Sequence, residues 1–237
     1  MAKEGLPSIY DYSLDELKEK LKPSFRAKQV YNWLYKKYAN SYDEMKNIPN
    51  ELKEDLKENY PIDVMEIVKK EQSIDGSIKY LFKLRDNHTV EAVLLLMKEK
   101  KKDEDGNIVR SEKYTVCVSS QVGCKVGCSF CLTAKGGFVR NLTVGEYIAQ
   151  IVNIKRDNDI AENKALNIVY MGMGEPLDNF ENFIKAVSIF SELDGLAISR
   201  RRQTVSTSGI ASKIEKLGQI DLGIQNLSRY IGFSTKS

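Results

Sequence analysis

The chain has 237 residues, of which 42% are hydrophobic and 29% are charged, and its formal net charge is only +3. A chain of this length has room for a substantial hydrophobic core. No segment approaches the ~18 consecutive apolar residues of a membrane span, and no apolar stretch of a secretion signal opens the sequence. We therefore expect a cytoplasmic protein with no membrane partner, where clustered cysteines indicate metal ligands or catalysts before disulfides.

Residues 1–62 are predicted to be helical. Ser13 and Glu16 have the spacing of a capping box ahead of leucines at helical intervals, and a short helix is expected after Pro49. The segment 24–40 within it is basic and aromatic, with Arg26, Lys28, Lys36 and Lys37, a composition that suits docking on an RNA backbone. The alternative is that Trp33 and the tyrosines simply form a small core, and the residues alone favour that interpretation.

Residues 63–110 show the alternating pattern of strands. Asp75-Gly76 and Asp86-Asn87 are turn signals between three such runs, and Asp105-Gly106 predicts a further hairpin in the charged stretch 98–106. We therefore expect an antiparallel meander.

From residue 111 onward, strand patterns alternate with helical patterns, which predicts βαβ units and a parallel sheet, open or closed into a barrel. Polar or glycine-rich loops follow the first three strands, at the carboxyl ends where sites gather in such sheets. The predicted elements are a strand at 114–120, a helix at 143–157, a strand at 166–171, a helix at 179–193, a strand at 203–208, a helix at 210–217 and a strand at 221–225.

All four cysteines lie in one stretch of the sequence, CVSSQVGCKVGCSFC. Cys124, Cys128 and Cys131 have the spacing C-x3-C-x2-C, and Cys117 precedes them in a predicted strand. Structural zinc usually takes four ligands, whereas this chain has a single C-x2-C pair and one histidine, His88. A loop with three thiolates suits an iron–sulfur cluster better, with one iron left open. A structural zinc module, with Cys117 as the fourth ligand, remains the alternative.

The cysteine spacing, with Phe130 before the last cysteine, resembles the radical S-adenosylmethionine (SAM) superfamily. The longer strings TVCVSSQVGCKVGCSFCLTAKGGFVRNLT, NIVYMGMGEPLDNF and SRRRQTVSTSGI are similar to those of the RlmN and Cfr family of RNA methyltransferases. This resemblance implies an α/β fold, a partial radical SAM β/α barrel. We expect a helical RNA-binding-type domain at 1–62, an antiparallel extension at 63–110 and the barrel portion at 111–237.

The resemblance also implies the cofactors. Cys124, Cys128 and Cys131 match the ligands of a [4Fe-4S] cluster, whose open iron would bind SAM. One electron, from a donor such as flavodoxin, would then break a C–S bond and give a 5′-deoxyadenosyl radical. Residues matching SAM contacts are Gly174, Glu175 and Ser206. Without the resemblance, GMGEP would be a plain turn and the serine a helix cap.

In the family, a methyl group is carried on a cysteine near the C-terminus and passed to C2 of an adenine in 23S rRNA or tRNA. Cys117 matches a second cysteine that resolves the resulting protein–RNA crosslink, and Glu91 matches the proton acceptor. Taken alone, a cysteine in a strand is usually a small buried hydrophobe and a glutamate beginning a strand is usually solvated.

The sequence departs from the family after Gln225, and no cysteine follows Cys131. We therefore expect a C-terminally truncated or frameshifted chain, monomeric, without the methyl-carrying cysteine and inactive alone. The alternative from another class is a non-catalytic RNA-binding remnant, which would use the helical module and the basic segment Ser199–Gln203.

Overall fold

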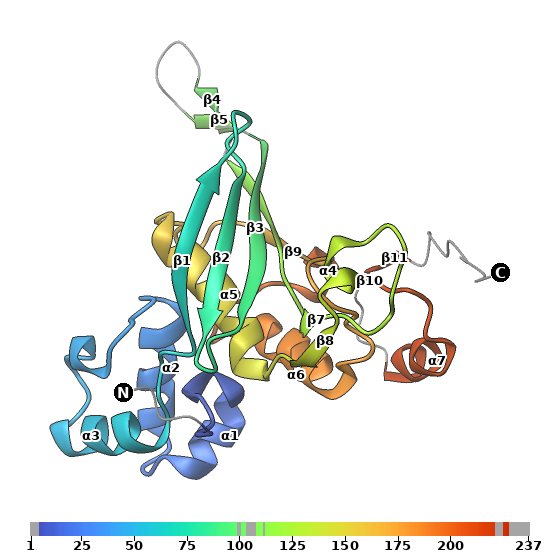
Figure 1. Ribbon diagram of the computed structural model, residues 1–237. Coiled ribbons are helices and arrows are strands. Elements are labelled where there is room, and N and C mark those ends of the chain that lie inside the picture. Colours follow the sequence, from blue (N-terminus) through green and yellow to red (C-terminus); the bar gives the residue numbers. More distant parts are fainter. Residues whose placement is uncertain (1–4, 99–100, 103–107, 111, 221–224, 228–237) are drawn as a thin grey trace.

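The computed structural model describes residues 5–98, 101–102, 108–110, 112–220 and 225–227 (Figure 1). The hairpin predicted at Asp105-Gly106, the strand residues 221–224 and the residues after 227 lie outside these ranges. Within the described ranges, no helix is both long and apolar enough to span a lipid bilayer.

The first part of the chain is helical, as its sequence predicts. The helices are α1 (Leu14–Lys20), α2 (Phe25–Tyr35) and α3 (Asn50–Asn59), with 3-10 turns at Ile9–Asp11 and Tyr42–Glu44. The predicted capping box is present: the Ser13 hydroxyl accepts from the Glu16 amide at 3.3 Å, and the Glu16 carboxylate accepts from the Ser13 amide at 2.7 Å. Tyr31 and Tyr35 are buried with their ring centroids 4.3 Å apart, and Trp33 packs partly buried against this core.

Seven strands form one sheet in the order β1-β2-β3-β6-β9-β10-β11. Their bounds are β1 Met65–Gln72, β2 Ile78–Leu84, β3 Thr89–Lys98, β6 Lys113–Cys117, β9 Leu166–Tyr170, β10 Gln203–Ser206 and β11 Gln225–Leu227. The pairs from β1 to β6 are antiparallel, and those from β6 to β11 are parallel. The predicted meander therefore continues directly into the predicted parallel sheet.

The other elements are two short strand pairs and the remaining helices. The strands are β4 (Lys101–Lys102) with β5 (Ile108–Arg110), and β7 (Gln121–Gly123) with β8 (Phe138–Asn141). The helices are α4 (Leu132–Lys135), α5 (Val144–Asp157), α6 (Phe180–Ser191) and α7 (Ala211–Ile220), with a 3-10 turn at Arg200–Arg202. The sequence patterns predict α5, α6 and α7, but not α4, β7 or β8, which all lie around the cysteines.

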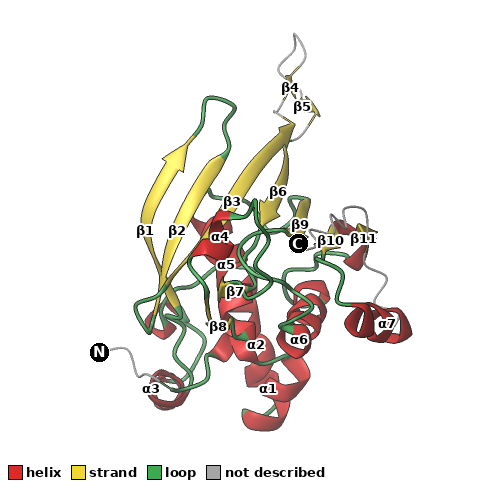
Figure 2. Ribbon diagram, turned by 45° about the vertical axis from the view of Figure 1, so that its right-hand side comes forward, coloured by secondary structure: helices red, strands yellow, loops and turns green. Residues whose placement is uncertain are grey.

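Helices α5 and α6 pack side by side on one face of the sheet (Figure 2). Tyr170 of β9 shows the contact: its ring meets Tyr147 of α5 and Phe183 of α6 edge to face, with centroids 6.2 and 4.8 Å away. Because side chains alternate along a strand, Cys117 and Val169 project from the opposite face. We call this opposite face of the sheet, on which Cys117 lies, the open face.

The helical module is bonded to the beginning of α5 and to the meander. The Asp11 carboxylate accepts from the Gly145 amide at 2.6 Å, in the first turn of α5, where the exposed amides favour a negative charge. A side chain at Gly145 would lie 3.0 Å from Ser8 Cβ. Arg85, after β2, donates to the carbonyls of Leu6, Pro61 and Asp63 at 2.7–3.3 Å. These bonds fix the module against both neighbours.

Glu192, which follows α6, also contacts the helical module. Its carboxylate accepts from the Leu14 amide at 3.2 Å and from the Tyr31 hydroxyl. Burial raises the pKa of Glu192 above its usual value, and these two hydrogen bonds only partly offset that effect. The folded protein therefore holds a proton on Glu192 more tightly than the unfolded chain does.

We expect this proton to be visible in the pH dependence of stability. A raised folded-state pKa gives a contribution that is complete below the unfolded value and is lost as the pH rises through the folded value. Relative to Glu192→Gln, the free energy of unfolding of the unaltered chain should therefore fall as the pH rises above 4.5, the ordinary pKa of a glutamate, in urea titrations. Glu181→Gln is the control with the opposite sign, because the hydrogen bond from Lys216 lowers the pKa of Glu181. A pH-independent difference for Glu192→Gln would contradict the assignment.

Candidate functional site

The cysteine segment is a loop between β7 and β8, beyond the carboxyl end of β6. Gly123 starts it with a φ of +74°, and a Cβ there would lie 1.9 Å from the Gly137 carbonyl oxygen. Only glycine permits the two strands to approach so closely. The Cys124 amide then donates to the same carbonyl at 2.9 Å, which closes the base of the loop.

Cys124, Cys128 and Cys131 are all half-buried free thiols on this loop. Burial raises the pKa of Cys124, and the thiols of Cys131 and Cys128 raise it further, so both of these sulfur atoms lie within electrostatic reach of Cys124. In the described part of the chain, no group of three or more Cys, His, Asp or Glu side chains is arranged to hold a metal ion. The loop thus gathers the three predicted ligands without placing them in a coordination geometry.

Cys117 and Glu91 project from the open face of the sheet on neighbouring strands. Cys117 lies directly opposite Val93 in the antiparallel β3–β6 register, and Glu91 is two residues from Val93 on the same face. They are therefore diagonal cross-strand neighbours, about 7–8 Å apart in regular sheets. Burial raises the pKa of Cys117, and a hydrogen bond with the Met171 backbone partly opposes this.

The position of Glu91 is fixed through its backbone. The Ser119 hydroxyl donates to the Glu91 carbonyl at 2.5 Å and accepts from the Met173 amide at 2.9 Å. The Glu91 carboxylate lies 3.5 Å from Lys79 Nζ, and this ion pair, followed by Glu71, raises the pKa of Lys79. Sequence reasoning missed Lys79, although its place on β2 in an alternating strand puts it on the face of Glu91.

The GMGEP segment lies directly against the chain that follows β6. Gly174 has a φ of +96°, and a Cβ there would lie 2.5 Å from Gln121 Cβ and 2.6 Å from Ser120 Oγ. The Glu175 carboxylate is buried and accepts from the amides of Leu177 at 3.0 Å and Ser208 at 2.6 Å. The carboxylate thus joins the GMGEP loop to the loop after β10.

Ser206 ends β10, two residues after Thr204, which is in register with Val169 and through it with Cys117. Ser206 therefore lies on the open face, at the same end of the sheet as Cys117. The structure brings Glu91, Cys117, Ser206 and the cysteine loop to one end of the sheet. The roles assigned to these residues, and to Gly174 and Glu175, remain predictions.

Sequence reasoning also missed the buried amides that hold these loops. Gln121 donates to Asn141 Oδ1 and Asp178 Oδ2, both at 2.8 Å, and accepts from the Glu175 amide at 2.9 Å. Asn179 donates to the Ser120 carbonyl at 2.9 Å and to the carbonyl of Leu142. The only signal in the sequence is that Gln121 directly follows a predicted strand and Asn179 opens a predicted helix.

Comparisons with known proteins agree with this arrangement. The structure matches the crystal structure of a radical SAM methyltransferase from Sphaerobacter thermophilus with a TM-score of 0.82 and 39% identity, covering 93% of this chain and 62% of that chain. The α/β class and the partial barrel are therefore confirmed, and the fold is that of a radical SAM methyltransferase.

The sequence matches indicate a particular family. Residues 10–62 match the ribosomal RNA large subunit methyltransferase N-terminal domain. The dual-specificity RNA methyltransferase RlmN of Aliarcobacter butzleri (strain RM4018) is 90% identical over 225 residues, and that of Wolinella succinogenes is 63% identical over 218 residues. These alignments cover 95% and 92% of this chain, but only 62% and 61% of the relatives. The chain is thus similar to RlmN proteins over nearly all of its length, and it spans about three fifths of the length of these curated relatives.

The close approach at Gly174 gives a testable prediction. Gly174→Ala should destabilise the chain by at least about 2 kcal/mol, because a left-handed backbone costs an L-residue roughly 1–2 kcal/mol and the methyl group also overlaps Gln121. Chemical unfolding monitored by circular dichroism measures the loss. Gly218→Ala on α7 is the matched control, since a Cβ there meets no atom within 4 Å. Equal stability of the two variants would contradict this account of the loop.

Proposed function

We propose that the chain carries the cluster-binding and SAM-binding part of an RNA methyltransferase that acts on C2 of an adenine in 23S rRNA and in tRNA. The observation that carries the proposal is the meeting of Cys117, Glu91 and the three-cysteine loop at one end of the open face. The family relationship supports the same chemistry. We retain the division into a helical domain at 1–62, an extension at 63–110 and a barrel portion at 111–237 as part of this proposal.

Cys124, Cys128 and Cys131 would hold the [4Fe-4S] cluster. Three thiols on one short loop fit this group by donor chemistry, because soft thiolates are the usual ligands of iron–sulfur clusters and three of them leave one iron open. When bound, the cluster supplies the electron for SAM cleavage, drawn from a donor such as flavodoxin. Gly174 would allow SAM to approach the backbone, and Glu175 would act through the loop junction that its carboxylate makes with Ser208.

Glu91 and Cys117 would then serve the RNA. The Glu91 carboxylate, held beside Lys79 Nζ, would accept a proton from the adenine ring carbon that is methylated. Cys117 would supply the thiol that releases the protein–RNA crosslink. Its raised pKa keeps the sulfur protonated near neutral pH, so a base must take its proton before attack.

A polypeptide of these 237 residues has no cysteine beyond the four between Cys117 and Cys131. In the proposed reaction, three hold the cluster and one resolves the crosslink, so none is left to carry the methyl group. We therefore expect this polypeptide, tested by itself and as a monomer, to cleave SAM without methylating RNA. Transfer of labelled methyl from SAM to an adenine-containing RNA by the purified chain would contradict this.

Anaerobic reconstitution with iron and sulfide tests the cluster assignment. The unaltered chain should become brown and bind about four iron and four sulfide per chain, as the proposed [4Fe-4S] cluster requires. Single alanine variants of Cys124, Cys128 or Cys131 should lose the chromophore and SAM cleavage. Cys117→Ala is the matched control and should keep the chromophore, because its thiol belongs to the strand and not to the loop.

The same measurement separates the alternatives. One tightly bound zinc per chain that is lost in Cys117→Ala would favour the structural zinc module. Salt-dependent RNA binding with neither iron nor zinc would favour the non-catalytic RNA-binding protein. Either result would contradict the proposed function.

A further inference from the structure

A polar cavity lies on the open face of the sheet. It extends from Lys113, at the amino end of β6, to Val169 and Thr204, which are level with Cys117. Its volume is about 380 Å³, which is on the order of a dozen water molecules at about 30 Å³ each. This is more space than a single small ion fills. The side chains that line it and could contact a ligand through polar atoms are Lys113, Thr115, Asn167, Arg201, Arg202 and Thr204.

The charge of this cavity is entirely positive. Its lining contains Lys113, Arg201 and Arg202 and no acidic residue. All three cations are exposed, and none of them forms an ion pair with any carboxylate that the structure describes. Nearby Lys164, in contrast, is paired with Glu112 at 3.1 Å. Three neighbouring cations without a protein counter-ion repel one another, so an anion that binds among them relieves that repulsion.

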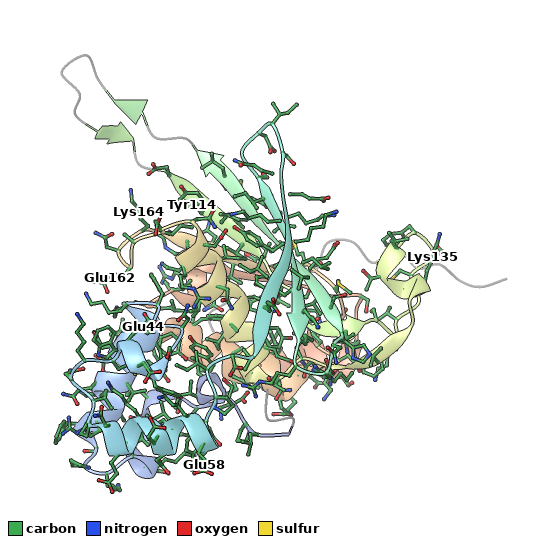
Figure 3. All side chains as sticks on the ribbon, turned by 60° about the vertical axis from the view of Figure 1, so that its left-hand side comes forward. Glu44, Glu58, Tyr114, Lys135, Glu162 and Lys164 are labelled. Carbon is green, nitrogen blue, oxygen red and sulfur yellow. The ribbon has the colours of Figure 1, made fainter. Side chains whose placement is uncertain are left out.

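The cavity opens on the face that carries the proposed reacting groups. Lys113, Thr115 and Cys117 alternate along β6 and so share one face, as do Thr204 and Ser206 along β10. At about 3.3 Å per residue, Lys113 lies roughly 13 Å along the strand from Cys117. Figure 3 shows the two ends: Tyr114 and Lys164 mark the amino ends of β6 and β9, far from Lys135 beside the cysteine loop.

The side chains of the cavity match the chemistry of phosphate. Guanidinium groups present a planar set of donors that fits two phosphate oxygens, and lysine adds a point charge. Threonine hydroxyls and asparagine amides are common contacts to phosphate and sugar oxygens in nucleic-acid complexes. The lining has no carboxylate, and its three charged side chains would repel a cation. The ligand class is therefore a phosphate ester.

We propose that this cavity binds a phosphodiester group of a single-stranded RNA segment whose neighbouring base lies on the open face near Cys117. The cavity is larger than one phosphate, and it shares a face with the groups that would act on a base, so a chain of nucleotides fits better than a free ion. The place given to the base rests on the proposed function, whereas phosphate binding by Lys113, Arg201 and Arg202 does not.

The test is the salt dependence of RNA binding by the full 237-residue chain. A fluorescein-labelled, adenine-containing RNA 12-mer is titrated with protein at 50 to 200 mM KCl and followed by anisotropy. Each phosphate contact to a single strand contributes about 0.7 to the slope of log K against log salt. The Arg201→Gln/Arg202→Gln variant should therefore have a slope smaller by about 1.4. The ratio of its dissociation constant to that of the unaltered chain should therefore fall about sevenfold from 50 to 200 mM KCl.

Arg200→Gln is the matched control, because Arg200 lies in the same 3-10 turn and is exposed but does not line the cavity. It should bind RNA like the unaltered chain. Lys113→Gln, from a different strand, should reduce the slope by about 0.7 on its own. Arg201→Lys/Arg202→Lys should restore most of the slope but less of the affinity, because lysine keeps the charge and loses the two-point contact.

Three results would overturn the inference. The first is a double glutamine variant whose slope equals that of the unaltered chain, with unchanged circular dichroism. The second is loss of the whole salt dependence in Lys36→Gln/Lys37→Gln at the end of α2, which would place RNA on the helical module. The third is competition by inorganic phosphate at concentrations too low to act by ionic strength, which would make the cavity a free-phosphate site. SAM cleavage by the reconstituted unaltered chain is measured separately, so a failure of the proposed function is distinguishable from a failure here.

Discussion

The structure depends most on the close approach of two backbone segments beyond the carboxyl ends of β6 and β9. Gly172 and Gly174 lie so near residues 118–121 that a Cβ at either glycine would be under 3 Å from backbone or side-chain atoms. This contact lets the Met173 carbonyl accept from the amides of Ser120 and Gln121. Everything else at this end of the sheet is attached to one of these two segments, so their separation sets the geometry of the whole site.

The consequences extend in both directions along the chain. Through Ser119 the contact reaches the Glu91 carbonyl on β3, and through Gln121 it reaches Asn141 at the end of β8. Arg140, next to Asn141, makes a bidentate pair with Glu146 at 2.8 Å and contacts Asp86 at 2.6 Å, between β2 and β3. The cysteine loop is thus held at its base by strand pairing and by charged hydrogen bonds, while its thiols remain half-exposed.

Most of the fold could be predicted from the sequence, because hydrophobic period and turn residues are local signals. Ser13 and Glu16 indicate the start of α1, and the alternation of apolar and polar residues in the meander indicates its strands. The short pair β7 and β8 could not be predicted in this way, because it is held by the contact of Gly123 with Gly137, fourteen residues away. The helical 132–135 segment is too short for a periodic pattern. Within the site, the residue types predicted chemistry, but the network of Gln121 and Asn179 arises only where distant loops meet.

The antiparallel meander has a clear role in this arrangement. In a purely parallel sheet, all strands run in the same direction, so only their carboxyl ends would contribute side chains to this end of the sheet. Because β3 runs antiparallel to β6, its beginning lies beside the end of β6, and Glu91 reaches the level just beyond Cys117. Lys79, on β2, then lies within 3.5 Å of the Glu91 carboxylate. The extension therefore adds a carboxylate and its counter-ion beside the Cys117 thiol of β6, and the two kinds of group lie on the face of the sheet opposite α5 and α6.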